Sequence, residues 1–305
     1  MHKKRNKRSE KSSLGLPKSL VVRLDYQVVP EHDVVLPPLS SKVMKYAVLS
    51  RQLLPLDGVG SLVRSRDKNK PLFMSNLKLG GKALVSEGKE ITVKAGSPLA
   101  GSLGFLHRGE LDPGELPWEK KVETPYGTFS FSLTGIQVLE VDSLVNSKEE
   151  IQGNILLKFV SPAVMSSKAF IPPSLKERFR RFKSGYLLLP PIGLVLGYAY
   201  KTYCSALSMA DSQHCEVNTY RYSVLFTGLS SVFGFRLRPV TVVVGNDNKG
   251  NLRKTRGVTG WVEFDIVHLK YKARALKFLK VASFLGLGKS RGIGFGEVEV
   301  TVKPP

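Results

Sequence analysis

The sequence is poor in the features that mark secreted, membrane and metal-binding proteins. It holds two cysteines, Cys204 and Cys215, which are too few for a disulfide framework or a cysteine-based zinc site. No run of 18 apolar residues occurs, so a transmembrane helix is not predicted. The first 18 residues lack the apolar core of a secretory signal. We therefore expect a cytoplasmic protein that does not associate with membranes.

The sequence is also short of acidic residues. It has 25 Asp and Glu against 46 Lys and Arg, which gives a formal net charge of +21. An excess of this size predicts a polyanionic partner, most often nucleic acid. The His, Cys, Asp and Glu residues show no spacing typical of metal ligands. Neither a Ser-His-Asp arrangement nor a pair of carboxylates stands out, so no metal and no cofactor are expected.

A glycine-rich stretch near the end, residues 286–296 (GLGKSRGIGFG), carries the strongest local signal. Glycine lets a backbone approach a ligand closely, and neighbouring N–H groups beside cations favour a phosphate. A Walker A loop is excluded, because Ser283 stands where its first glycine belongs and a predicted helix precedes the stretch. The order helix, glycines, strand also excludes a dinucleotide fingerprint.

We predict instead that this stretch contacts a nucleic-acid backbone. The residues predicted to make the contact are Gly288, Lys289, Ser290, Arg291 and Gly292. A connection that serves packing alone is the alternative.

The hydrophobic pattern divides the chain into two similar halves. Residues 142–153 are polar and lack a strand pattern, so we place a boundary there, between domains over residues 19–145 and 153–305. The second half predicts the order β-α-β-β-α-β of a ferredoxin-like domain. The first half begins in the same way, with its second helix weak or missing. The expected fold is α+β, with two tandem ferredoxin-like (RRM-like) domains and a C-terminal glycine-rich loop.

Outside these domains, residues 1–18 predict a disordered basic arm, which either touches RNA or DNA or has no role. Within them, periodicity predicts helices over residues 41–53, 192–210, 219–235 and 269–285. Strands of the second half are predicted over residues 155–165, 236–245, 257–267 and 297–302. Loops are predicted over residues 64–71 and 245–251.

Five blocks of sequence carry a resemblance to a known family. They are spread from about residue 24 to residue 302 and read VVLPPLSSKVMKYAVLS, SRDKNKPLF, KFVSPAVMSSKAFIPPSL, GNLRKTRGVTGWVEFDI and SFLGLGKSRGIGFGEVEV. The chain resembles the repeat-associated RNA-binding superfamily of CRISPR systems. Within it, the chain is similar to crenarchaeal members of the sixth Cas protein family, the endoribonuclease that cuts precursor CRISPR RNA within its repeats.

The resemblance implies RNA cleavage without a metal, in which a ribose 2′-hydroxyl attacks the neighbouring phosphorus. The products would be a 2′,3′-cyclic phosphate and a 5′-hydroxyl, and mature crRNA would be released. Many family members use a histidine in or after the first helix, but none lies over residues 41–53 here. His32 and His107 stay as weaker candidates. The chain is similar to the histidine-less branch, in which lysines act.

Lys45, Lys42 and Lys70 are therefore the candidate catalytic lysines. Lys42 and Lys45 are three residues apart and share a predicted helix face. Lys70 closes a loop that we expect to fold back over that helix. A lysine among other cations has a lowered pKa and exchanges protons more readily. A solvated helix face is the alternative for Lys42 and Lys45.

Two further basic groups are expected to contact RNA. Arg253, Lys254 and Arg256 follow a predicted turn, and the family match favours RNA contact over a solvated hairpin tip. We expect Arg256 to be the catalytic-site member nearest the scissile phosphate. The segment 174–185, which includes Arg180 and Arg181, is either a phosphate track or a helix surface.

The implied partner is CRISPR repeat RNA, as pre-crRNA and as crRNA. Contact with subunits of a CRISPR effector complex and pairing of two copies stay open. Two other functions stay open as well. One is a non-catalytic, crRNA-binding subunit of an effector complex, and the other is a general basic RNA-binding protein.

Overall fold

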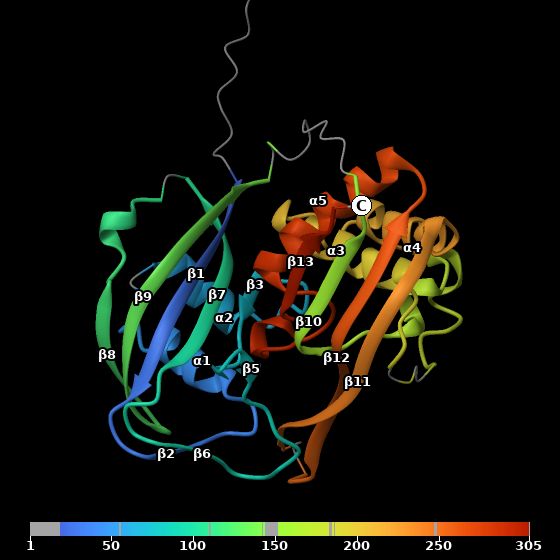
Figure 1. The fold of residues 1–305 in the computed structure, drawn as a ribbon. Coiled ribbons are helices and arrows are strands. Elements are labelled where there is room, and N and C mark those ends of the chain that lie inside the picture. Colours follow the sequence, from blue (N-terminus) through green and yellow to red (C-terminus); the bar gives the residue numbers. More distant parts are fainter. Residues whose placement is uncertain are drawn as a thin grey trace, which may run out of the picture.

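The computed structural model describes residues 19–54, 56–109, 111–141, 143, 152–182, 185, 187–246 and 249–304. The predicted arm over residues 1–18 and most of the predicted boundary over 142–153 lie outside these ranges. Figure 1 shows two antiparallel sheets side by side, with the helices packed behind them. The two sheets meet where β7 and β3 of one approach β10 and β13 of the other.

The first half holds a ferredoxin-like arrangement with an elaborated edge. Its elements are β1 (Ser19–Pro30), β2 (Val34–Leu36), α1 (Ser41–Leu49), α2 (Asp57–Arg64), β3 (Leu72–Met74), β4 (Lys78–Leu79), β5 (Lys82–Ala83), β6 (Ile91–Val93), β7 (Leu99–Arg108), β8 (Glu119–Thr124) and β9 (Gly127–Glu140). β2 and β6 pair with each other in a small sheet of their own. In the large sheet of this half the strand order is β5-β4-β7-β1-β9-β8, and β3 also pairs with β7. β1 alternates apolar and polar residues, and its apolar side packs on α1 in the main core of this half.

The second sheet has the full ferredoxin-like set. Its elements are β10 (Ile155–Ala163), α3 (Ile192–Ala206), α4 (Gln213–Leu229), β11 (Ser230–Asn246), β12 (Leu252–Ile266), α5 (Leu269–Leu285) and β13 (Val298–Val302). The order β11-β12-β10-β13 places the first and third strands at the centre, as a ferredoxin-like fold requires. Two helices, α3 and α4, fill the first crossover. The predicted fold class of two tandem ferredoxin-like units is thus confirmed.

Several predicted elements differ from the observed ones. The first helix ends at Leu49, and a second helix, α2, which the sequence did not predict, follows after Pro55. α4 begins at Gln213 rather than 219, because the Ser212 hydroxyl caps it by accepting a hydrogen bond from the Cys215 amide at 3.1 Å. The residues after Leu229 join β11. The α5 prediction is confirmed with both of its bounds, Leu269 and Leu285.

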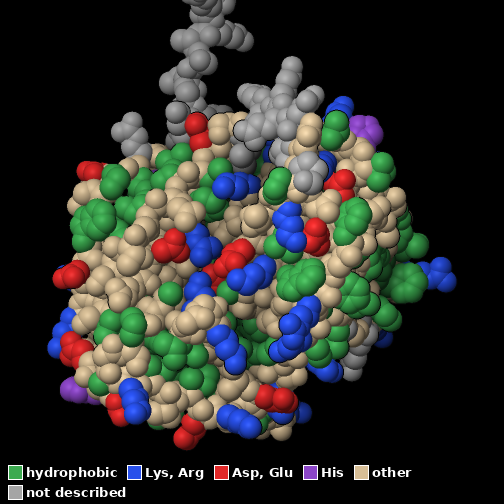
Figure 2. All heavy atoms as spheres, in the orientation of Figure 1, with side chains coloured by type: hydrophobic (Ala, Val, Ile, Leu, Met, Phe, Trp, Pro, Cys, Tyr) green, Lys and Arg blue, Asp and Glu red, His purple; other side chains and the backbone are tan. Residues whose placement is uncertain are grey.

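Helix α5 ties the two halves together. Phe284 and Leu285 at its end share a small core with Val21 of β1. The chain of β7 comes so close that a Cβ built at Gly104 would lie 1.9 Å from the Phe284 carbonyl oxygen. Charged side chains of both signs gather over the junction, as Figure 2 shows. The glycine-rich loop that follows α5 is therefore delivered to the boundary between the two sheets.

Candidate functional site

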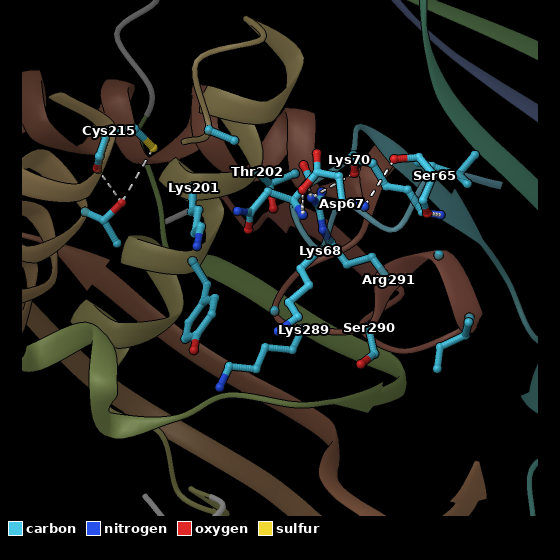
Figure 3. Close-up of a pocket in the computed structure, with 18 of the residues that line it drawn as sticks. Ser65, Asp67, Lys68, Lys70, Lys201, Thr202, Cys215, Lys289, Ser290 and Arg291 are labelled. Carbon is cyan, nitrogen blue, oxygen red and sulfur yellow. Dashed lines mark hydrogen bonds between the residues drawn. The ribbon is translucent and has the colours of Figure 1, made fainter. Parts of the chain in front are cut away.

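A cavity of about 800 Å³ opens where the loop after α2, helices α3 and α4 and the glycine-rich loop meet (Figure 3). Its lining is strongly basic. The Lys and Arg residues on its walls are Lys45, Arg64, Arg66, Lys68, Lys70, Lys168, Lys176, Lys201, Lys289 and Arg291, and the acidic ones are Asp67 and Glu216. A concave surface with one dominant sign of charge concentrates ions of the opposite sign. The cavity is therefore suited to an anionic ligand.

Lys70 is held in this cavity by two hydrogen bonds. Its Nζ donates to the carbonyl oxygens of Val63 at 3.0 Å and Ser65 at 2.9 Å, at the end of α2. Burial lowers the pKa of Lys70, the charge of Lys45 lowers it further, and Asp67 opposes the shift. A lysine with a lowered pKa has a larger neutral fraction and accepts a proton more readily. The structure brings Lys70 and Lys45 to one cavity, as a loop that folds back toward α1 would do.

Lys42 lies apart from this pair. It lines a second hollow of about 400 Å³, together with the segment Val35–Pro38 and Tyr126. Lys45 lines the large cavity instead. The two lysines are close in sequence, but they reach different hollows.

The glycine-rich loop fastens helix α1, which carries Lys45. The Ser41 hydroxyl donates to the Ile293 carbonyl oxygen at 2.8 Å, and the Asn76 amide nitrogen donates to that of Gly294 at 2.6 Å. Asn76 in turn accepts from the Ser41 backbone N–H at 3.2 Å, so a side chain of another segment caps α1. Gly294 has a φ of 94°, and an added Cβ would meet Asn76 and Ser41 within 2.8 Å. Packing is therefore part of this loop's role.

Several backbone amides of the loop are already bonded. The N–H of Leu287 donates to Gly296, that of Lys289 to Val164, and that of Gly296 to Pro162, at 2.7 to 3.0 Å. Gly288, Ser290 and Gly292, at which we predicted a phosphate contact, are interspersed with these residues along the loop. Gly288 and Gly292 line the cavity together with Ser290, which adopts the left-handed conformation with φ of 62°.

Arg291 corrects an expectation from the sequence. It is 6% exposed, and its guanidinium donates to the carbonyl oxygens of Leu285, Asn69 and Lys70 and to the Ser205 hydroxyl. Burial lowers the pKa of Arg291 to about 10. A side chain engaged in this way holds the loop against the Lys70 segment. The structure gives Arg291 a positioning role in place of the predicted RNA contact.

The remaining predicted residues lie away from the cavity. Arg253, Lys254 and Arg256 belong to strand β12, which begins at Leu252 and pairs with β11 from there, so their predicted placement between two strands was wrong. All three are exposed, and Lys254 pairs with Glu87 of the first half at 3.2 Å. Arg180 and Arg181 are exposed in a series of turns rather than on a helix. None of these residues lines the large cavity.

Comparison with known proteins agrees with this architecture. The family model for the Cas6 N-terminal domain matches residues 22–139, and the model for the CRISPR-associated endoribonuclease Cas6 matches residues 157–298. The chain belongs to the Cas6 family of CRISPR-associated endoribonucleases. Two relatives from Saccharolobus solfataricus, named CRISPR-associated endoribonuclease Cas6 1 and Cas6 2, are 43% and 41% identical. Each alignment covers 92% of this chain and 96% of the relative.

Solved Cas6 structures share the fold. A Cas6 product complex superposes with a TM-score of 0.56 at 19% identity, over 94% of this chain and 100% of that one. Thermus thermophilus Cas6 gives a TM-score of 0.55 at 17% identity, with the same coverage. At these identities the likeness concerns the fold alone.

The structure also bears on the candidate histidines, on metal ligands and on membrane-spanning helices. None of the histidines in the described ranges lines the large cavity, and His32 is exposed on the loop between β1 and β2. Among the residues that the structure describes, no three His, Cys, Asp or Glu side chains are grouped as metal ligands would be. The described helices include none that is long and apolar enough to cross a bilayer.

Sequence reasoning missed three lysines of the cavity: Lys68, Lys168 and Lys201. A signal existed for one of them. Lys201 is the sole charged residue in the 15-residue helix α3, whose other side chains are mostly apolar and buried. A lone charge on such a helix is costly to bury and marks a position that faces a polar site. For Lys68 and Lys168, which lie in irregular segments, the sequence offered no comparable signal.

Proposed function

We propose that this protein cleaves precursor CRISPR RNA within its repeats and releases mature crRNA, without a metal ion. The observation that carries the proposal is that Lys45 and Lys70 line the same basic cavity. Burial and the like charge of Lys45 lower the pKa of Lys70 there. The names of the Saccharolobus relatives support the reaction class.

The lysine pair supplies the three tasks of a transesterification. Neutral Lys70 accepts the proton of the ribose 2′-hydroxyl, and the freed oxygen attacks the adjacent phosphorus. The bond from phosphorus to the 5′-oxygen breaks, and protonated Lys45 donates a proton to that leaving oxygen. Lys45 also offsets negative charge on the phosphorane before it transfers the proton. General acid and base groups typically contribute about 10²–10⁴-fold each, and fixed cations near the developing charge contribute a comparable factor.

Other predicted residues take supporting roles in this proposal. Lys42 in the neighbouring hollow contacts the RNA backbone beyond the cut rather than the breaking bond. Arg256, with Arg253 and Lys254, offers exposed cations on β12 for a more distant part of the repeat. Lys289 faces the cavity from the glycine-rich loop and binds phosphate there. Subunits of a CRISPR effector complex and a second copy remain predicted partners, and the cytoplasm remains the predicted location.

The test uses a panel of synthetic RNAs, each with one CRISPR repeat, incubated with pure protein in EDTA. A single cut that leaves a 2′,3′-cyclic phosphate and a 5′-hydroxyl is expected. An RNA with a 2′-deoxy nucleotide before the cut must stay intact, because it lacks the attacking hydroxyl. Tight binding to a repeat without a cut would favour a non-catalytic subunit. Binding that ignores the repeat sequence and weakens steeply with salt would favour a general RNA-binding protein.

A further inference from the structure

The large cavity extends well beyond Lys45 and Lys70. Four more lysines line it from four separate segments: Lys68 after α2, Lys168 in the short 3-10 helix Ser167–Phe170, Lys201 in α3 and Lys289 in the glycine-rich loop. Figure 3 shows Lys68, Lys201 and Lys289 extending into the same hollow. We call this part of the cavity the lysine chamber.

Among the described residues, the positive charges on the cavity wall far outnumber the negative ones. Within those residues, none of the four lysines of the lysine chamber forms an ion pair. The two acidic residues on the cavity wall have partners other than these four lysines, and the charge of Asp67 raises the pKa of Lys70 and Arg291. Glu216 pairs with Lys176 at 2.9 Å, and the Asp67 carboxylate accepts from the backbone N–H of Asn69 at 2.7 Å.

The positive charges of the lysine chamber act on one another in the free protein. Burial lowers the pKa of Lys289, and Lys168, Lys201 and Lys68 lower it further. Like charges held together in this way oppose folding, and a bound anion would reduce that repulsion. A solvated lysine surface would not need to bring four separate segments to one hollow.

The size and walls of the chamber indicate what kind of anion enters. The whole cavity, which includes the lysine chamber and the part beside Lys45 and Lys70, has a volume of about 800 Å³, within the range of sites that enclose one small organic ligand. A double helix is too wide for such a hollow, whereas a nucleotide turned out of its stack fits. Tyr220 of α4 lies half-buried on the wall, and aromatic rings of this kind stack with unpaired bases.

We propose that the lysine chamber receives an unpaired nucleotide of the RNA beside the scissile phosphodiester. The phosphates next to this nucleotide lie between Lys68, Lys168, Lys201 and Lys289, and its base lies against Tyr220. The inference rests on the proposed function for its ligand, RNA, and adds that the RNA must be single-stranded next to the cut. It places no bond-breaking role on the four lysines.

The experiment compares two double variants with the same loss of charge. Lys168→Gln with Lys201→Gln removes two charges from the chamber. Lys82→Gln with Lys120→Gln removes two exposed charges on the first sheet, outside the cavity. The probe is the panel RNA that the wild type cleaves or, if it cleaves none, the one that it binds most tightly. Binding is measured over a range of salt concentrations.

The chamber variant should bind more weakly than the control. Its slope of log K against log salt should fall by about 0.7 for each phosphate of a single strand that the variant no longer neutralises. Its melting temperature should equal or exceed that of the wild type, because the change relieves repulsion around Lys289. A retained melting temperature excludes misfolding as the cause of weaker binding.

A second measurement tests the unpaired state. A short complementary strand that pairs the nucleotides around the cut should weaken binding to the wild type and to the control. The same strand should have little effect on the chamber variant, in which the nucleotide is no longer held by Lys168 and Lys201.

Equal affinity and equal salt slope for the two double variants would overturn the inference, even if the wild type cuts repeat RNA. Undiminished binding of the locally paired RNA to the wild type would overturn it as well. If the wild-type protein binds RNA through the lysine chamber but does not cut it, the proposed function is wrong and the inference about the chamber still holds.

Discussion

Arg23 in the first strand and Glu297 just after the glycine-rich loop meet at 3.2 Å, although 274 residues separate them in the chain. Lys78 joins the same carboxylate oxygen at 2.6 Å, and Glu297 is 2% exposed. Arg23 also donates to the Ser283 carbonyl oxygen at the end of α5, at 2.8 Å. A single acidic side chain of the second half thus holds two cations of the first.

Glu297→Gln should destabilise the protein strongly, because it leaves Lys78 with a neutral partner at a buried boundary and Arg23 with Asp25, at 3.0 Å, as its remaining carboxylate. Loss of one member of a buried ion pair costs about 3–5 kcal/mol. The matched control is Glu299→Gln, which removes an exposed pair with Lys158 at 2.9 Å and should cost less than about 1 kcal/mol. Urea unfolding measures the free energy of unfolding of both variants. Equal losses would show that the buried ion pairs of Glu297 stabilise the protein no more than the exposed pair does.

Lys45→Ala should slow cleavage at least about tenfold while RNA affinity is largely kept, because the lysine acts on the transition state. Lys42→Ala is the control on the same helix. Since Lys42 reaches a different hollow, its loss should weaken binding more than it slows the single-turnover rate. A Lys45 variant that cuts at the wild-type rate contradicts the proposed proton donor.

The rate of cleavage should rise with pH and level off below the range of an ordinary lysine, whose pKa is about 10.4. The reason is that Lys70 must be neutral to accept a proton, and its pKa is lowered by burial and by Lys45. Lys45→Gln removes one of these causes, so the pKa of Lys70 rises and the ascending limb moves to higher pH. Single-turnover rates across pH measure the shift. An unmoved limb in the variant would exclude Lys70 as the base.

Arg291→Lys should lower stability by about 2 kcal/mol or more, because one ammonium cannot satisfy the four acceptors that the guanidinium reaches. It should also slow cleavage, since the guanidinium holds the carbonyl groups of Asn69 and Lys70. RNA affinity of the folded protein should change little. The neighbouring change Lys289→Gln should do the reverse, with weaker binding and an unchanged melting temperature. Thermal unfolding and equilibrium binding separate the two outcomes.

Sequence patterns predicted the architecture well where the apolar periodicity was strong. Helix α5 was placed to the residue, and β10 and β13 were found because their alternation is clear. Helix α2 was missed since Pro55, Gly58 and Gly60 indicate a loop, yet Val59 and Val63 bury against the core of the first half. Tertiary packing outweighed local propensity there.

The site was predicted in part, and the gap has a physical cause. Lys45 and Lys70 could be suggested from the family blocks, because the residues around them match. Arg291 looked like a phosphate ligand because sequence shows its charge and not its four buried acceptors. The lysines at 68, 168 and 201 come from distant segments, and only folding brings them to one cavity.

The glycine-rich loop has a consequence for engineering. The loop belongs to the second half, but side chains of the first half bind it. Ser41 and Asn76 donate hydrogen bonds to the loop, and Arg23 donates one to Glu297 just after it. The two halves are therefore not interchangeable modules. A chimera that takes its first half from a relative must keep these three side chains together. Without them, the glycine-rich loop would no longer fix the position of α1 and of Lys45.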